Sequence, residues 1–235
     1  MANSDPWLFF DKIYCISIAE RTDRREEAKR QFAKVGLEGK VEFVIVRKHP
    51  LNQEQGIYES HLLCLRKAIE AEASHLLIFE DDILFTGFNP ESLREALKAL
   101  AAVGEWDLFF LGCLVSRSQK TENPNLLQIR YCALTHAYGM SRAFAETAVK
   151  IPWAGIPYDL FLKRAQKKAY ALYPAFAFQS NARTDNRLLF LERVRRICGG
   201  LAWIQKINEL YQRHKLTLIM AHLVAVGVLL LLAWR

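Results

Sequence analysis

Three acidic residues in succession, Glu80-Asp81-Asp82, follow an apolar segment at residues 75–79. A continuous apolar run of this kind predicts a central strand covered on both faces, whose C-terminal end reaches solvent. Carboxylates at such an end can bind Mg²⁺ or Mn²⁺, because one or two of them suffice when phosphate oxygens and waters supply the other ligands. A solvated acidic turn is the alternative, and the triplet alone does not decide between the two interpretations.

The patterns around the triplet predict the elements that would position it. Short β-branched and aromatic runs alternate with segments in which apolar residues recur every three or four positions, as expected of strands and amphipathic helices. Up to residue 113 the predicted strands are 13–18, 42–46, 75–79 and 106–111, and the predicted helices are 22–35, 58–69 and 90–102. This alternation predicts an α/β fold with a mostly parallel sheet flanked by helices.

The pattern after residue 113 is less regular. The polar residues 116–125 are expected to form a loop, followed by a strand at 127–134 and helices at 141–150 and 158–168. Two short apolar pieces, 169–173 and 175–178, flank Pro174. Because proline is confined to edge strands and bends, these pieces predict an edge strand or a bent crossing beneath the site.

The positive charge of the chain lies in its C-terminal part. The net charge is +7, and residues 187–235 hold eight Lys or Arg against two Glu, which leaves +1 for residues 1–186. A nucleic-acid-binding protein would carry a basic stripe on its folded body, so nucleic acid is excluded as a partner. A basic tail instead favours contact with an anionic surface.

The last residues are apolar enough to suggest a membrane segment. Residues 216–234 carry no formal charge over nineteen positions, about the length that crosses roughly 30 Å of hydrocarbon as a helix. We therefore expect a catalytic domain at 1–186, a basic amphipathic juxtamembrane segment at 187–215 and a transmembrane or membrane-inserted helix at 216–234. A buried C-terminal core helix and a linker helix packed on the domain are the alternatives.

The location follows from the two ends of the chain. The first twenty residues lack the basic start and the uninterrupted apolar core of a secretory signal. Basic residues just before the apolar tail favour the cytoplasmic side. We expect the inner membrane, with the folded domain facing the cytosol and membrane lipids as partners of the tail.

Several segments, taken in order, resemble glycosyltransferase family 25, which includes bacterial lipopolysaccharide glycosyltransferases and collagen galactosyltransferases. The resemblance covers roughly residues 12–181. It rests on the segments YCISIAERTDRR at 14–25, GIYESH at 56–61, IFEDD at 78–82, WD at 106–107 with LG at 111–112, and THAYGMSR at 135–142. Each segment alone is weak, whereas their order and spacing are specific. The resemblance implies an inverting enzyme with a nucleotide-binding fold of the GT-A type and acidic metal ligands.

The resemblance also implies roles for the acidic triplet. Asp82 would be a ligand of Mn²⁺ or Mg²⁺, and Asp81 would contact the metal, the ribose or the sugar. Side chains alternate along a strand, so Glu80 would join Asp82 at the metal only if the strand runs that far.

Other candidates come from the starts and ends of the predicted elements. Arg21 and Arg24 follow the first strand, where a guanidinium could pair with a diphosphate, although an exposed helix start is the alternative. Ser60 and His61 are placed at the start of the second helix, where free backbone N–H groups favour an anion. His136 follows a predicted strand and is a candidate for a sugar or metal contact. A purely structural role is the alternative for both histidines.

Inversion by a single displacement needs one base to take the proton of the acceptor hydroxyl. Asp159, at a predicted helix start, resembles the late Asp of the family, and the alternative is that it only caps that helix. One departure concerns the first strand, which continues into Asn-Leu in the family and into Ser17-Ile18 here. A contact made by that Asn is therefore absent or replaced by a hydroxyl.

The sequence and the resemblance therefore predict transfer of a hexose from a nucleotide sugar to a lipid-linked or lipopolysaccharide-core glycan. We expect the donor to be a UDP-hexose. A second hypothesis is a membrane-anchored, non-catalytic protein that binds sugar nucleotides with the same fold. A metal phosphohydrolase is a third, but it would need more clustered His and Asp ligands than the sequence offers.

Overall fold

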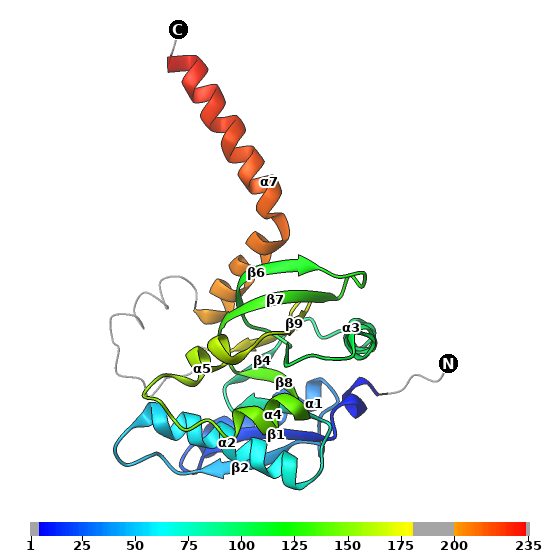
Figure 1. Cartoon of the computed structure of the whole chain (residues 1–235), viewed down its shortest axis with the longest axis vertical. Helices are drawn as coiled ribbons and strands as arrows, with labels where there is room; N and C mark the ends of the chain where they lie inside the picture. Colours follow the sequence, from blue (N-terminus) through cyan, green and yellow to red (C-terminus); the bar gives the residue numbers. More distant parts are fainter. Residues whose placement is uncertain (1–4, 181–199, 234–235) are drawn as a thin grey trace.

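A twisted sheet of eight strands runs through the protein, in the order β2-β1-β3-β8-β5-β9-β7-β6 (Figure 1). The computed structural model describes residues 5–180 and 200–233, with the backbone alone at residue 216 and residues 227–233. The strands are β1 (Lys12–Ile18), β2 (Glu42–Val46), β3 (His75–Glu80), β5 (Leu108–Phe110), β6 (Leu114–Lys120), β7 (Leu126–Ala133), β8 (Ala137–Ser141) and β9 (Ala169–Leu172). A separate two-stranded sheet pairs β4 (Ile83–Phe85) with β10 (Ala177–Gln179).

Helices cover both faces of the large sheet. One core cluster includes α1 (Thr22–Lys34), α3 (Pro90–Val103) and the short 3-10 helix η1 (Pro6–Phe9). The other includes α2 (Gln53–Glu70), α4 (Arg142–Ala148) and α5 (Tyr158–Ala165). Because each cluster takes its sheet residues from alternate positions of the strands, β3 is apolar on both faces, as its sequence predicted.

Local sequence signals explain several helix ends. The side chain of Asn52 accepts a hydrogen bond from the N–H of Gln55 and starts α2. Asn89 caps α3 in the same way, Pro90 occupies its first turn, and Gly104 ends it at a φ of 83°. The alternation of strands and helices up to residue 113 is confirmed.

The sheet is mostly parallel, as predicted. The pairs β1–β2, β1–β3 and β5–β9 are parallel, while β8 runs antiparallel to β3 and β5, and β7 runs antiparallel to β6 and β9. Six strands therefore share one direction, and only β7 and β8 oppose it. Sequence patterning missed β8, because its five residues form neither a long apolar run nor an alternation.

Two predictions for the later part of the chain were wrong. The polar segment 116–125 does not form a loop over its whole length, because β6 pairs with β7 through residues 114–120. Polar residues are tolerated there because β6 is the last strand of the sheet and most of its side chains are exposed. Of the two apolar pieces predicted as an edge strand or a bent crossing, the first forms β9, which is not an edge strand because it lies between β5 and β7. The second contributes to β10, which pairs with β4 alone.

The C-terminal part is one helix, α7 (Leu201–Ala233), which runs through the predicted boundary at residue 216. Its first turns lie beside β6, and the rest extends away from the body (Figure 1). Over the residues that the structure describes, no helix combines the length and apolar character needed to cross a membrane. The predicted transmembrane helix at 216–234 thus finds no support there, and residues 187–199 of the predicted juxtamembrane segment lie outside the described residues.

Candidate functional site

A cavity of about 440 Å³ opens where the parallel strands β1, β2 and β3 end. The C-terminal edge of parallel strands is the usual place for a ligand in an open α/β sheet. The structure brings six of the predicted site residues into its wall. They are Arg24, Ser60, His61, Glu80, Asp81 and Asp82.

Asp81 is held by two neighbours on β1 and α1. The hydroxyl of Ser17 donates to Asp81 Oδ2 at 2.7 Å, and Arg24 Nη1 lies 3.3 Å from Asp81 Oδ1. The side chain of Ser17 thus contacts the acidic triplet directly, while its equivalence to a contact of the family's Asn stays a prediction. Burial raises the pKa of Asp81 above its usual value, although the Ser17 hydrogen bond and Arg24 oppose this effect.

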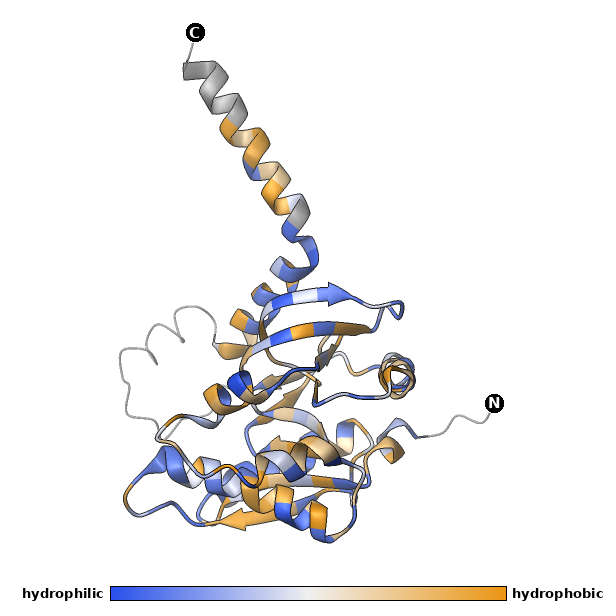
Figure 2. Ribbon diagram, viewed as in Figure 1, coloured by the Kyte–Doolittle hydropathy of each residue, from blue (hydrophilic) through white to orange (hydrophobic). Residues whose placement is uncertain are grey.

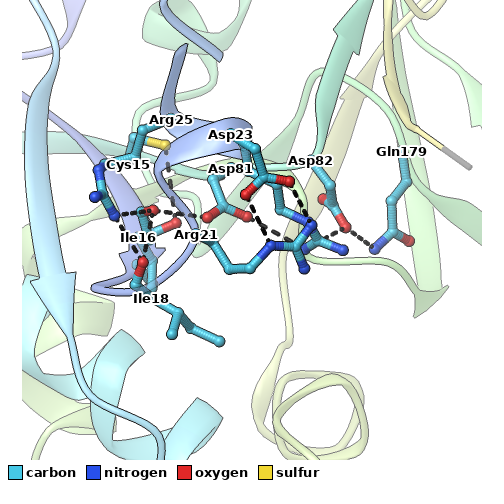
Figure 3. Close-up of polar contacts among 11 residues, drawn as sticks. Cys15, Ile16, Ile18, Arg21, Asp23, Arg25, Asp81, Asp82 and Gln179 are labelled. Carbon is cyan, nitrogen blue, oxygen red and sulfur yellow. Dashed lines mark hydrogen bonds and ion pairs between the residues drawn. The ribbon is translucent and has the colours of Figure 1, made fainter. Parts of the chain in front are cut away.

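Asp82 is the more buried carboxyl, and one of its oxygens lacks a partner. Gln179 Nε2 donates to Asp82 Oδ2 at 2.8 Å, while Oδ1 has no hydrogen-bond partner among the described residues (Figure 3). Burial and the nearby charge of Glu80 raise the pKa of Asp82 to about 7. Gln179 reaches Asp82 because β10 pairs with β4, directly after the triplet.

The expected alternation of the triplet does not hold. Strand β3 ends at Glu80, so Asp81 and Asp82 lie in the following turn and both face the cavity. The guanidinium of Arg24 lies between them, with Nη1 3.3 Å from Asp81 Oδ1 and 3.7 Å from Asp82 Oδ2. Arg24 thus contacts both aspartates, whereas Glu80 lies at the last position of the strand.

Glu80 belongs to a buried polar network on the other side of the triplet. Thr135 donates its hydroxyl proton to Glu80 Oε1 at 2.6 Å, and His61 Nε2 lies 3.7 Å from the same oxygen. Burial acts to raise the pKa of Glu80, but His61 and Thr135 outweigh it, so the pKa lies below its usual value. The carboxylate of Glu80 is therefore ionised at neutral pH.

His61 is fixed from both sides of its ring. Its Nδ1 lies 2.9 Å from the hydroxyl of Tyr138, which lies 3.0 Å from that of Tyr158, and the ring of Tyr158 stacks on the imidazole. Ser60 donates to the carbonyl of Gly56 at 2.6 Å. Helix α2 begins at Gln53, so the expectation that Ser60 and His61 begin a helix with free N–H groups was wrong. Any ligand contact would come from their side chains.

The cavity wall also includes three consecutive basic residues, which the sequence reasoning missed. Arg47, Lys48 and His49 follow β2 and line the cavity. His49 Nδ1 accepts the N–H of Asn52 at 2.9 Å, which leaves the proton of a neutral imidazole on Nε2. Gly56 allows this loop to approach α2, because a Cβ there would lie 2.7 Å from His49 Cβ. The signal in the sequence was the run of basic residues at the C-terminal end of a predicted parallel strand.

Three predicted residues are not in the cavity wall. Arg21 makes a bidentate ion pair with Asp23, both contacts being 3.0 Å. His136 is fully buried, its Nε2 lies 3.1 Å from the carbonyl of Ala177, and burial lowers its pKa. Its Nδ1 has no hydrogen-bond partner among the described residues. Asp159 accepts the Tyr131 hydroxyl at 2.8 Å and the N–H of Leu134 at 3.3 Å.

The two aspartates fit a divalent cation whose shell a diphosphate completes. The described residues include no cluster of three or more His, Cys, Asp or Glu that could bind a metal by itself. The pair nevertheless offers hard oxygens, including the unpartnered Asp82 Oδ1, and a cation would offset the cost of burying two like charges. Asp81 and Asp82 thus fit the few protein ligands of a Mg²⁺ or Mn²⁺ site whose other ligands are phosphate oxygens and waters.

Comparisons with known proteins give distant likenesses only. No protein-family profile matches the chain, and no curated protein matches it. Among solved structures, a protein from STIV has a TM-score of 0.48 at 16% identity, covering 71% of this chain and 83% of its own. A mannose-1-phosphate geranyltransferase from Thermus thermophilus has a TM-score of 0.45 at 12% identity, covering 68% and 73%. A glycosyltransferase involved in glycosylation of the major capsid of PBCV-1 has 0.40 at 12%, covering 68% and 80%. At these identities and TM-scores, the likenesses do not establish an activity for this protein.

Proposed function

We propose that this protein is a metal-dependent, inverting glycosyltransferase that uses a nucleotide sugar, in the manner that the resemblance to family 25 implies. The observation that carries the proposal is the cavity at the ends of β1, β2 and β3, whose wall includes Arg47 and Lys48 as well as the carboxylates of Asp81 and Asp82. A nucleoside diphosphate needs cationic groups for its phosphates and carboxylates for the accompanying metal ion. A UDP-hexose is the expected donor.

Within this proposal the chain's own groups bind the donor. Asp82 and Asp81 would hold the Mn²⁺ or Mg²⁺, which when bound stabilises negative charge on the departing diphosphate. Arg24 contacts both aspartates and would also pair with the phosphates of the donor. Arg47 and Lys48 would add positive charge in the same cavity. The Nε2–H of His49 would be a further hydrogen-bond donor in the same wall, because Nδ1 accepts the N–H of Asn52.

The chemical step is a single displacement. The acceptor oxygen forms a bond to the anomeric carbon as the bond to the diphosphate oxygen breaks, and a base receives the hydroxyl proton. Asp159 is the base that the family resemblance implies. Glu80 is the second candidate, because it is ionised and lies in the cavity wall, whereas Asp159 is bonded to Tyr131 and Leu134 outside it.

The acceptor is proposed to be a lipid-linked or lipopolysaccharide-core glycan at the cytoplasmic face of the inner membrane. The apolar outer part of α7 supports a lipid-bearing acceptor, because its side chains are exposed. The resemblance supports a glycan.

Release of nucleoside diphosphate tests the proposal. The purified protein is incubated with a panel of nucleotide sugars and a lipid-linked glycan, with and without Mn²⁺, for wild type, Asp82→Ala and the exposed control Asp23→Ala. We expect metal-dependent release that Asp82→Ala reduces at least about 100-fold and that Asp23→Ala leaves within a few-fold. Equal turnover by wild type and Asp82→Ala would remove the metal role.

The non-catalytic alternative gives a different result in the same preparation. A protein that binds the nucleotide sugar in a calorimetric titration, but releases no diphosphate with any donor and acceptor, would be a sugar-nucleotide-binding protein with this fold.

A further inference from the structure

A second cavity, of about 650 Å³, lies between α7 and the β6–β7–β9 end of the sheet. This volume lies in the range of cavities that hold small molecules. Its apolar wall comes from the strands, through Val115, Leu127, Ile129, Ala171 and Leu172. It shares no lining residue with the cavity at the ends of β1, β2 and β3.

Basic side chains from α7 and β6 line the same cavity. Arg213 lies over the ring of Tyr173, 5.5 Å from its centroid, and Lys215 donates to the carbonyl of Ser118 at 3.1 Å. Lys120 is exposed at the end of β6. Two acids also line the cavity, Glu122, which is exposed, and Glu209, which accepts the N–H of Ala175 at 3.0 Å. The cavity thus combines an apolar wall with cations on α7 and β6, which suits a molecule with an anionic head and an apolar chain.

The helix beyond the cavity is apolar on every side. Over residues 217–226 the large apolar side chains are between 39% and 61% exposed, and they are Leu218, Ile219, Met220, Leu223, Val224 and Val226. At 100° per residue these positions span about 240° of the circumference. Thr217, Ala221 and Ala225 occupy the remaining arc and His222 is the other polar residue, so no continuous polar face remains for water. Figure 2 shows the same change from hydrophilic residues where α7 leaves the body to hydrophobic ones beyond.

Such a helix needs an apolar environment around its whole circumference. A protein partner or a second copy would cover one stripe, whereas lipid surrounds a helix completely. Ten residues rise about 15 Å, so the described apolar side chains alone reach well into a hydrocarbon core of roughly 30 Å.

From these observations we infer that α7 enters the hydrocarbon core of an anionic membrane, and that the cavity at its base receives the phosphate headgroup of a phospholipid. Lys120 and Arg213 bind the headgroup, and the apolar wall of the cavity accepts the start of its chains. The inference does not rest on glycosyl transfer.

Vesicle flotation of the full chain, without nucleotide sugar, tests this inference. Vesicles of phosphatidylcholine with about 30% phosphatidylglycerol are compared with phosphatidylcholine alone, at about 0.15 M salt so that distant charges are screened. We expect stronger binding to the anionic vesicles. Lys120→Ala with Arg213→Ala should weaken that binding about 30-fold, since each basic residue near an anionic surface is worth about a factor of five.

Two further variants separate the cavity from general attraction. Lys34→Ala with Arg66→Ala removes the same charge from α1 and α2 and should leave binding within about two-fold. Leu223→Asp with Val224→Asp should abolish binding to both kinds of vesicle, because charges at the bilayer centre cost several kcal/mol. Circular dichroism checks that each variant is folded.

Three results would overturn the inference. The wild type could fail to bind vesicles. The Lys120 and Arg213 pair could weaken binding no more than the control pair, which would mean that the cavity takes no headgroup. The wild type could instead form a dimer in the absence of lipid that Leu223→Asp with Val224→Asp dissociates, which would make this helix an interface between copies.

Discussion

Asp82 is the residue whose environment is least like that of a free carboxyl. It is buried, one oxygen has no hydrogen-bond partner among the described residues, and its pKa is raised to about 7 by burial and by Glu80. Such a group destabilises the folded protein when it is ionised, and a bound cation would reverse that effect. The cost of burying this ionised carboxyl therefore arises at the position where the proposed metal would bind.

This environment predicts how stability depends on pH. The pKa of Asp82 rises from 3.8 to about 7 on folding, so the folded protein binds the proton more tightly between those values. The contribution of Asp82 to stability therefore falls as the pH rises through this window and is constant above it.

Asp82→Asn should remove that contribution. We expect its free energy of unfolding to exceed that of wild type by about 1–3 kcal/mol at pH 8, with a smaller difference at pH 5. Urea denaturation at the two pH values measures it, with Asp23→Asn as the exposed control. A variant less stable than wild type at pH 8 would show that the buried charge is compensated.

The identity of the base gives a second prediction at this scale. If Glu80 accepts the proton, Glu80→Gln lowers kcat by about 100-fold or more and Asp159→Asn does not, since a general base contributes typically 10²–10⁴-fold. If Asp159 is the base, the order reverses. Because Asp159 also bonds Tyr131 and Leu134, the stability of each variant is measured beside kcat.

Sequence reasoning found six residues of the cavity wall, including all three of its acids, but not how they contact one another. The triplet, Arg24 and His61 were predicted because they belong to motifs in register with predicted strands and helices. The basic residues 47–49 were missed because they belong to none of those motifs. Asp81 and Asp82 both face the cavity because β3 ends at Glu80. The sequence alone does not define the last residue of a strand to better than one or two residues.

At the scale of elements, the two-stranded sheet β4–β10 brings Gln179 to Asp82. It packs on the large sheet at Gly112, where an added Cβ would lie 1.9 Å from the carbonyl of Ala177 and 2.6 Å from Gln205 Nε2. Both neighbours would have to move, and one of them is backbone. The position of β10, and with it that of Gln179, depends on this glycine.

Gly112→Ala should therefore be costly. We expect a loss of more than about 3 kcal/mol of unfolding free energy, at the upper end of overpacking effects. Gly139→Ala is the matched comparison, because its Cβ would meet a ring atom of Phe10 at 2.8 Å and the ring can shift. Thermal denaturation of both variants measures the two losses of stability. If Gly112→Ala loses no more stability than Gly139→Ala, the close packing of Gly112 against the carbonyl of Ala177 would be contradicted.

The regular elements were predictable, whereas β6, β8 and β9 were misplaced or missed. A long apolar strand or an amphipathic helix is encoded within its own residues. Strand β6 is largely polar, and its pairing with β7 depends on a partner that no local pattern specifies.

At the scale of the whole molecule, α7 attaches to the body by an unusual face. Asn208 accepts the N–H of Val115 and donates to its carbonyl, both at 3.0 Å, and Gln205 donates to the carbonyl of Ala177 at 2.9 Å. Trp203 and Ile207 point outward and are 57% and 54% exposed. The helix thus presents polar side chains to the sheet and apolar ones to its surroundings, which hydropathy alone could not predict.

This attachment yields a prediction. Asn208→Ala leaves the N–H of Val115 without its α7 partner and its carbonyl with only the 3.4 Å hydrogen bond from Gln212 Nε2. We expect the variant to destabilise the protein by about 1–2 kcal/mol. Ile207→Ala, one residue away on the exposed face, should change stability by less than about 0.5 kcal/mol. Urea denaturation of both variants measures this, and equal losses would show that α7 is not held by its polar face.

The central claim is that the cavity at the ends of β1, β2 and β3 binds a nucleoside diphosphate together with a divalent cation held by Asp82. Calorimetric titration of UDP into the protein, with and without Mn²⁺, tests it most directly. We predict that Mn²⁺ tightens UDP binding to wild type and to Asp23→Asn at least about tenfold, or 1.4 kcal/mol, and that Asp82→Asn abolishes this gain. A wild type that does not bind UDP, or an equal Mn²⁺ effect in Asp82→Asn, would contradict the claim.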